Sequence, residues 1–117
     1  MTENLTKEKF DEIFPNFENS PEWKYNGEKP AIIKFSTNWC GPCKAMVPIF
    51  KDLSEKMGEK VKFYEVNAGM EIDLPSMFKV NSVPTIIFFP VGENFIKKVG
   101  AIPQKEIEKI IEEKFKI

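Results

Sequence analysis

Residues 35–44 read FSTNWCGPCK and contain the only two cysteines of this 117-residue chain, Cys40 and Cys43. If Cys40 opens a helix, its sulfur lies against unpaired backbone N–H groups and the positive end of the helix dipole, which favour the thiolate. Cys43 then lies one turn later on the same face. Pro42 suits the first helical turn, where its missing N–H is not needed. The segment therefore predicts an attacking thiolate and a resolving thiol on a rigid frame.

A metal site and a static disulfide are the alternatives for this cysteine pair. Zinc takes four ligands, usually Cys or His, and the chain has two cysteines and no histidine. A Cys-rich zinc site is thus open only if two chains share the metal. A static disulfide across so short a loop gains little, because the entropic stabilisation grows with loop length. We predict reversible thiol–disulfide exchange and no metal.

Three segments in register carry a resemblance to thioredoxins. FSTNWCGPCK resembles the active-site segment of that family, VPT at residues 83–85 resembles its cis-proline loop, and KVGA at residues 98–101 resembles its glycine turn. The order and spacing agree from about Pro30 to the C-terminus. The chain is therefore identified as a member of the thioredoxin family. The resemblance implies the α/β thioredoxin fold, a central mixed β-sheet flanked by helices on both faces.

The hydrophobic pattern predicts the same architecture from the residues alone. Strands are expected over residues 31–36, 61–66, 85–89 and 95–99, and helices over 6–14, 40–57, 73–78 and from 103 onward. A β-α-β part followed by a hairpin and a helix builds a mixed sheet. We expect a single domain over residues 1–117, with a helix and a long loop in residues 1–29 and the core in 30–117. Trp23 and Tyr25 are expected to cover the sheet.

The net charge and the distribution of apolar residues bear on which kinds of partner the protein binds. The net charge is −1, which gives no electrostatic reason to expect nucleic acid or an anionic membrane. The first residues contain no apolar run, and no segment approaches 18 apolar residues. Together with a dithiol that has to be kept reduced, these features favour the cytoplasm. We expect the protein to be a monomer.

The chemistry assigns a role to each cysteine. Cys40 is expected to be exposed and to attack a client disulfide, and Cys43 is expected to be shielded and to resolve the mixed disulfide. By resemblance, Val83, beside Pro84, pairs with the client chain like an added strand. The residues expected to form a flat docking surface are Trp39, Gly41, Pro42, Val83, Pro84, Gly100 and Ala101. For Trp39, plain packing is an equal alternative.

The sequence departs from the family at three positions. Thioredoxins usually carry a buried aspartate six residues before the first cysteine and a lysine opposite it, whereas this chain has Lys34 and Glu65. Lys34 could reach water and touch nothing catalytic, favour the Cys43 thiolate by its charge, or act as a base. We list Lys34 and Glu65 with Trp39, Gly41 and Pro42 as residues that support the active site. Ser36 replaces the usual aromatic residue, which predicts a looser floor beneath the cysteines.

The predicted function is reduction of protein disulfides through the reversible Cys40–Cys43 dithiol, with no cofactor besides that disulfide. By resemblance, Gly-Pro between the cysteines and the absence of histidine favour a reductase over an oxidase or isomerase. The implied partners are disulfide-containing client proteins and a thioredoxin-reductase-like recycling enzyme. Two alternatives stay open: a non-catalytic binding module or subunit with this fold, and a dedicated reductant with one client.

Overall fold

The computed structural model describes residues 2–17 and 22–117 and contains a five-stranded mixed sheet. The strands are β1 (Glu3–Asn4), β2 (Ala31–Ser36), β3 (Lys62–Asn67), β4 (Thr85–Phe89) and β5 (Ile96–Val99). They lie in the order β1-β3-β2-β4-β5. The first three in this order run parallel, β4 is antiparallel to β2, and β5 is antiparallel to β4.

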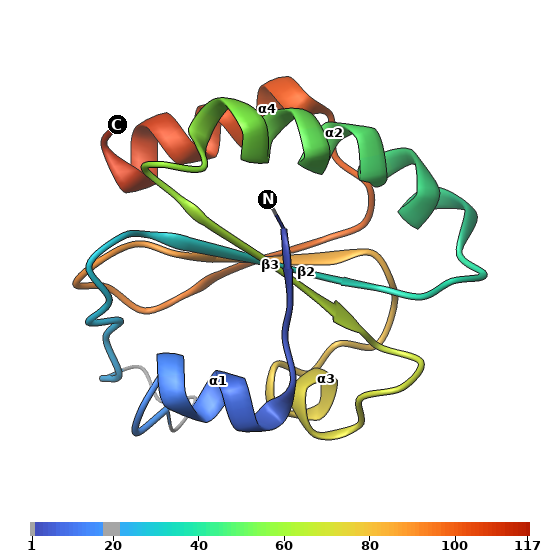
Figure 1. Cartoon of the computed structure of the whole chain (residues 1–117), viewed down its shortest axis with the longest axis horizontal. Helices are drawn as coiled ribbons and strands as arrows, with labels where there is room; N and C mark the ends of the chain where they lie inside the picture. The colour runs from blue at the N-terminus through green and yellow to red at the C-terminus, as the bar shows by residue number, and fades with distance from the viewer. Residues whose placement is uncertain (1, 18–21) are drawn as a thin grey trace.

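Helices cover both faces of the sheet (Figure 1). One face carries α2 (Gly41–Met57) and α4 (Gln104–Ile110), which continues into the π-helical turn η1 (Ile111–Phe115). The other carries α1 (Lys7–Ile13) and α3 (Asp73–Met77). The predicted α/β architecture is therefore confirmed.

Strand β2 runs through the middle of the sheet and divides its side chains between two cores. Ile33 and Phe35 pack into the core on the α1/α3 face, and Ile32 packs into the core on the α2/α4 face. Side chains alternate along a strand, so Lys34 lies on the same side as Ile32. Lys34 is the one charged side chain that is buried in the described part of the chain. The sheet thus places a lysine under the helix that begins with the cysteine pair.

The strand β1 was missed by the sequence analysis. It pairs with β3 in parallel register, with Asn4 opposite Glu65, and the Leu5 N–H donates to the Glu65 carbonyl at 2.8 Å. Two residues are too few to show the alternation of apolar and polar side chains that identifies a strand, so β1 could not be predicted from the sequence. The pairing matters because it brings the start of the chain beside Glu65.

The region expected to be a loop, residues 15–29, has no helix or strand at its described positions, and residues 18–21 lie outside the described ranges. Tyr25 is buried, and its ring and that of Trp23 lie 5.7 and 5.9 Å from the Phe89 ring. The prediction that both aromatic residues cover the sheet is confirmed. Among the helices that the structure describes, none has the length and apolar character to cross a membrane.

Candidate active site

Cys40 lies at the N-cap of α2, as the sequence predicted. Its sulfur accepts a hydrogen bond from the Cys43 N–H at 3.1 Å, and Pro42 lies in the first turn of the helix. The two sulfurs are joined in a disulfide. A backbone donor and the helix dipole therefore both act on the Cys40 sulfur, and both favour its thiolate in the reduced protein.

The exposure predicted for Cys40 is wrong in the disulfide form. Cys40 is only 8% exposed and Cys43 is 3% exposed, so both are buried. The Cys40 sulfur is covered because the helix N-terminus lies on one side and the Val83 carbonyl oxygen lies 3.7 Å away. Cys40 is still the more accessible of the two, which is the order that the predicted roles require.

The cis-proline loop and the glycine turn lie together beside the cysteines. The Val83–Pro84 peptide bond is cis, as the resemblance implied. The Gly100 N–H donates to the Pro84 carbonyl at 2.8 Å. Gly100 has φ of +95°, a backbone conformation that favours glycine. Two segments far apart in sequence are thereby held at one edge of the active site, with Val83 against Cys40.

The residues predicted for docking differ in how much surface they offer. Trp39 is 74% exposed, and Gly41, Pro42 and Ala101 are also exposed. Val83 and Gly100 are half-buried, whereas Pro84 is buried, contrary to the expectation that it joins the surface. The Pro84 ring is enclosed because the loop turns back into β4 at Thr85, which is itself buried.

Trp39 lies against Gly69, a residue that the sequence analysis did not single out. A Cβ atom on Gly69 would lie 2.5 Å from the Trp39 ring, closer than side chains tolerate. The Gly69 N–H is held by the Asn67 side chain at 2.9 Å. Trp39 thus rests on a glycine and leaves most of its ring in solvent, which favours contact with a client over plain packing.

Lys34 and Glu65 form the expected ion pair, with Nζ and Oε2 3.7 Å apart. The Lys34 side chain is 3% exposed and the Glu65 side chain 42%. The Lys34 ammonium also lies 5.0 Å from the centre of the Phe50 ring. Burial lowers the pKa of Lys34 from its ordinary value, and Glu65 acts in the opposite direction. The alternative in which Lys34 reaches water is wrong, because the side chain has almost no exposure.

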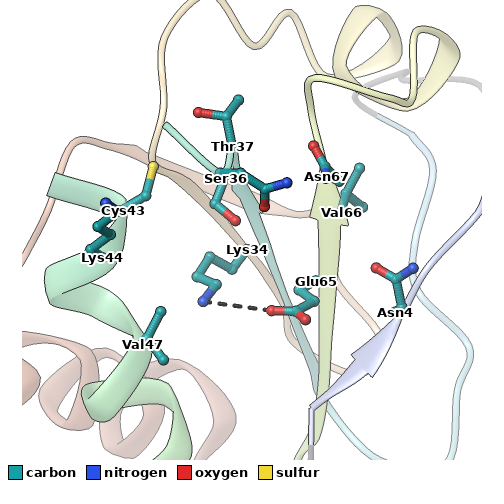
Figure 2. A pocket seen from close by; sticks show the side chains of 11 residues that line it. Asn4, Lys34, Ser36, Thr37, Cys43, Lys44, Val47, Glu65, Val66 and Asn67 are labelled. Atoms are coloured by element: carbon teal, nitrogen blue, oxygen red, sulfur yellow. Dashed lines mark ion pairs between the residues drawn. The ribbon is translucent and has the colours of Figure 1, made fainter. Parts of the chain in front are cut away.

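A pocket of about 270 Å³, the Cys43 pocket, lies between the start of α2 and strands β2 and β3. Figure 2 shows Cys43 on one wall and Glu65 on the other, with Lys34 and Ser36 between them. Its lining is formed by Asn4, Lys34, Ser36, Thr37, Asn38, Cys43, Lys44, Val47, Glu65, Val66 and Asn67. Ser36, from which a looser floor is predicted, is one of these lining residues. Asn4, Thr37 and Asn67 were missed, because nothing in their spacing connects them to the cysteines.

Within the described part of the chain, no group of three or more His, Cys, Asp or Glu side chains lies close enough together to hold a metal ion. The site is built around two sulfurs, one helix N-terminus and the ion pair between the buried Lys34 and the half-exposed Glu65. Such an arrangement can form and break a disulfide, and the sulfurs themselves carry the electrons.

Comparison with known proteins agrees with this chemistry. The thioredoxin family model matches residues 2–113. A thioredoxin of Borreliella burgdorferi is 41% identical over 115 residues, which cover 98% of both chains. The chloroplastic thioredoxin M4 of Arabidopsis thaliana is 35% identical over 101 residues, which cover 84% of this chain and 52% of the relative.

Solved structures give the same result. The thioredoxin of Malassezia sympodialis superposes with a TM-score of 0.75 at 27% identity, covering 96% of this chain and 90% of that one. A chloroplastic thioredoxin z superposes with a TM-score of 0.74 at 20% identity, covering 94% and 90%, which shows the shared fold. The chain therefore belongs to the thioredoxin family, and Cys40–Cys43 is the redox pair of a thiol–disulfide oxidoreductase that reduces protein disulfides.

Proposed function

We propose that this protein is a general reductant of protein disulfides, returned to its dithiol form by a thioredoxin-reductase-like enzyme. The observation that carries the proposal is the Cys43 N–H aimed at the Cys40 sulfur at 3.1 Å, at the N-terminus of α2. A donor and a dipole at this sulfur favour the thiolate, which is the attacking form. Cys40 is thus suited to begin an exchange reaction and Cys43 to end it.

The reaction proceeds in two exchanges. The Cys40 thiolate attacks one sulfur of the client disulfide, and the other client sulfur leaves as a thiolate that takes a proton from solvent. Cys43 then loses its proton and attacks Cys40, which forms the Cys40–Cys43 bond and breaks the bond between Cys40 and the client. The second client sulfur leaves with the electron pair and is protonated. The client gains two electrons and two protons, and the cysteine pair is oxidised.

We propose that clients bind across a docking face formed by Trp39, Gly41, Pro42, Val83, Gly100 and Ala101. The contact between the Cys40 sulfur and the Val83 carbonyl, 3.7 Å apart, supports this arrangement because a chain bound along Val83 passes the attacking sulfur. The hydrogen bond from Gly100 to Pro84 holds the two sides of the face at a fixed spacing. Backbone pairing of this kind accepts many sequences, which favours a general client range over a dedicated one.

The thiol–disulfide chemistry also bears on the compartment, the oligomeric state and the cofactor requirement. We propose a cytoplasmic protein that acts as a monomer and needs no cofactor besides its own disulfide. The cytoplasm keeps thiols reduced, which the dithiol requires between turnovers. We also propose Lys34 and Glu65 as support for the active site, because both line the Cys43 pocket.

The test is the reduction potential of the Cys40–Cys43 pair, measured by equilibration with glutathione buffers. A reductant has a value near the roughly −270 mV of thioredoxin. A value near the roughly −180 to −120 mV of isomerases and oxidases would overturn the proposed direction. A Cys43→Ser variant, which stalls at the mixed disulfide, then captures clients: many clients indicate a general reductant, and one client indicates a dedicated one.

A further inference from the structure

Residues 78–84, which we call the Val83 segment, connect α3 to β4 and form neither helix nor strand. Both ends of this segment are held from the last strand. At its start, the Lys97 ammonium donates to the carbonyls of Phe78 and Lys79 at 3.1 and 2.8 Å. At its end, the Gly100 N–H, directly after β5, donates to the Pro84 carbonyl at 2.8 Å. The segment that carries Val83 is thus anchored twice to one short stretch of chain.

Lys97 reaches α3 because of the face of the sheet on which it lies. It pairs with Ile87 in the antiparallel ladder, and Ile87 packs into the core on the α1/α3 face. Its neighbour Lys98 pairs with Ile86, which packs into the core on the other face. Directly paired residues of a ladder share a face, so the two lysines lie on opposite faces. Lys97 is half-buried and Lys98 is exposed.

The end of α3 supplies carbonyls that need a donor. A helical carbonyl accepts from the N–H four residues later, and α3 ends at Met77, before such an N–H exists for Phe78 and Lys79. Lys79 has φ of +54°, a left-handed conformation that residues other than glycine rarely adopt. An ammonium group carries three N–H donors and can serve both carbonyls. Lys97 therefore fixes the turn with which the chain leaves α3.

The Val83 segment presents its backbone to the attacking sulfur. The Val83 carbonyl oxygen lies 3.7 Å from the Cys40 sulfur, and just before it the Ser82 carbonyl accepts from the Thr85 hydroxyl at 2.7 Å. A chain that pairs with a protein backbone binds more tightly when that backbone already has its bound form, because ordering a loop costs affinity. The anchors on either side of Val83 therefore bear on client binding.

We propose that Lys97 is a positioning residue for client binding: its ammonium fixes the start of the Val83 segment and keeps the Val83 backbone ready to pair with a client chain. The inference rests on the proposed function, since it requires clients to bind along Val83. Lys97 acts through the carbonyls of Phe78 and Lys79 and not on the sulfurs. Its removal affects disulfides that need the Val83 edge and spares those too small to use it.

The test compares a protein disulfide with a small one. The reduced protein is mixed with insulin or with bis(2-hydroxyethyl) disulfide and quenched with acid, and the oxidised fraction of the Cys40–Cys43 pair is measured by mass. Lys97→Met removes both hydrogen bonds, so the second-order rate constant with insulin is expected to fall about fivefold. The rate constant with the small disulfide is expected to change less than about twofold, which also shows that the variant is folded.

Two matched variants separate the hydrogen bonds from the charge. Lys98→Met removes the same charge from the same strand and touches neither carbonyl, so its rate with insulin should match the wild type. Lys97→Arg keeps the charge and the donors and should retain at least about half of the insulin rate. Three results would each overturn the role of Lys97: an unchanged insulin rate in Lys97→Met, equal slowing with both disulfides, or the same loss in Lys98→Met.

Amide hydrogen exchange reports the position of the segment directly. Exchange over residues 78–84 is expected to be several-fold faster in Lys97→Met than in the wild-type protein, and unchanged in Lys98→Met. Wild-type exchange over this segment in Lys97→Met would show that Lys97 does not hold it. Failure of the proposed function is distinguishable, because the wild-type protein itself would then reduce insulin no faster than the small disulfide.

Discussion

The two faces of the sheet are packed in different ways. On the α1/α3 face the core is apolar, and the Phe78 ring lies 5.1 to 6.0 Å from five other phenylalanine rings. On the α2/α4 side the sheet contributes the buried Lys34, and a pocket of about 270 Å³ lies next to Cys43. One face therefore supplies stability by dense packing, and the other gives up packing where the chemistry takes place.

The largest expected effect is on the chemistry of the α2/α4 face. Replacing Cys40 with Ser removes the nucleophile, so the rate of client reduction should fall by about a thousandfold or more. Because Cys40 lies at the end of a helix and not in either core, the reduced variant should unfold at nearly the same denaturant concentration as the reduced wild-type protein. A folded Cys40→Ser variant that retains more than about one hundredth of the activity would contradict the assignment.

The densely packed face should show the largest loss of stability. Phe78→Ala is expected to lower the free energy of unfolding by about 3–5 kcal/mol, because it empties a buried site among five rings. Denaturant titration measures the loss. Phe50→Ala is the matched change on the other face, where Phe50 contacts one ring, that of Phe63, and the Lys34 ammonium. A larger loss for Phe50→Ala than for Phe78→Ala would remove the contrast between the faces.

The cost of the buried lysine is a smaller effect with a defined pH dependence. Lys34→Met is expected to raise stability by about 1 kcal/mol at neutral pH, because it removes a buried charge and leaves the half-exposed Glu65 solvated. Burial lowers the pKa of Lys34 from 10.5. Between the lowered pKa and 10.5 the unfolded chain therefore binds more protons, and the wild-type protein gains stability as pH rises.

The advantage of Lys34→Met should accordingly shrink as the pH approaches 10.5. Urea titrations of both proteins from neutral to alkaline pH measure this difference. A constant advantage across that range would mean that Lys34 is not held in the buried, destabilised state that the structure shows.

The smallest expected effect concerns the position of Trp39. Gly69→Ala places a methyl group against the Trp39 ring, so the ring must move, and KM for a protein client should rise a few-fold, by about 0.5–1 kcal/mol in binding. Emission of Trp39 in a Trp23→Phe background reports the movement. Gly41→Ala adds the same methyl group where no atom lies within 4 Å, so its emission should match the parent. Identical spectra for both variants would show that Gly69 does not position Trp39.

The sequence was sufficient to predict the strands and helices whose apolar residues recur at regular spacing, and the site residues that belong to a recognisable motif. The strands 31–36 and 85–89 were predicted with the bounds that the structure has, because their apolar runs are bordered by Pro30, Thr37, Pro84 and Pro90. The N-cap position of Cys40 followed from the proline in the first turn. Local signals thus predicted the sheet, the main helix and the cysteine pair.

What the sequence could not predict depends on contacts between distant segments. β1 exists only because β3 offers it an edge, and the buried state of Cys40 results from the approach of Val83, 43 residues away. The Cys43 pocket combines residues of three strands and one helix, and besides Cys43 only Lys34, Ser36 and Glu65 among them were singled out from the sequence. Tertiary packing, which no local pattern encodes, decides all three features.

The short outer strands of the sheet have a consequence for how the protein behaves at high concentration. Long, flat, apolar edge strands act as templates on which a second chain can add and begin aggregation, and short length or lysine side chains oppose this. Here one edge is the two-residue β1, and the other is the four-residue β5, which carries Lys97 and Lys98. The Lys97 ammonium also donates to the carbonyls of Phe78 and Lys79 at 3.1 and 2.8 Å, which ties β5 to the end of α3. Both edge strands of the sheet therefore oppose the addition of a strand from a second chain, which would begin aggregation.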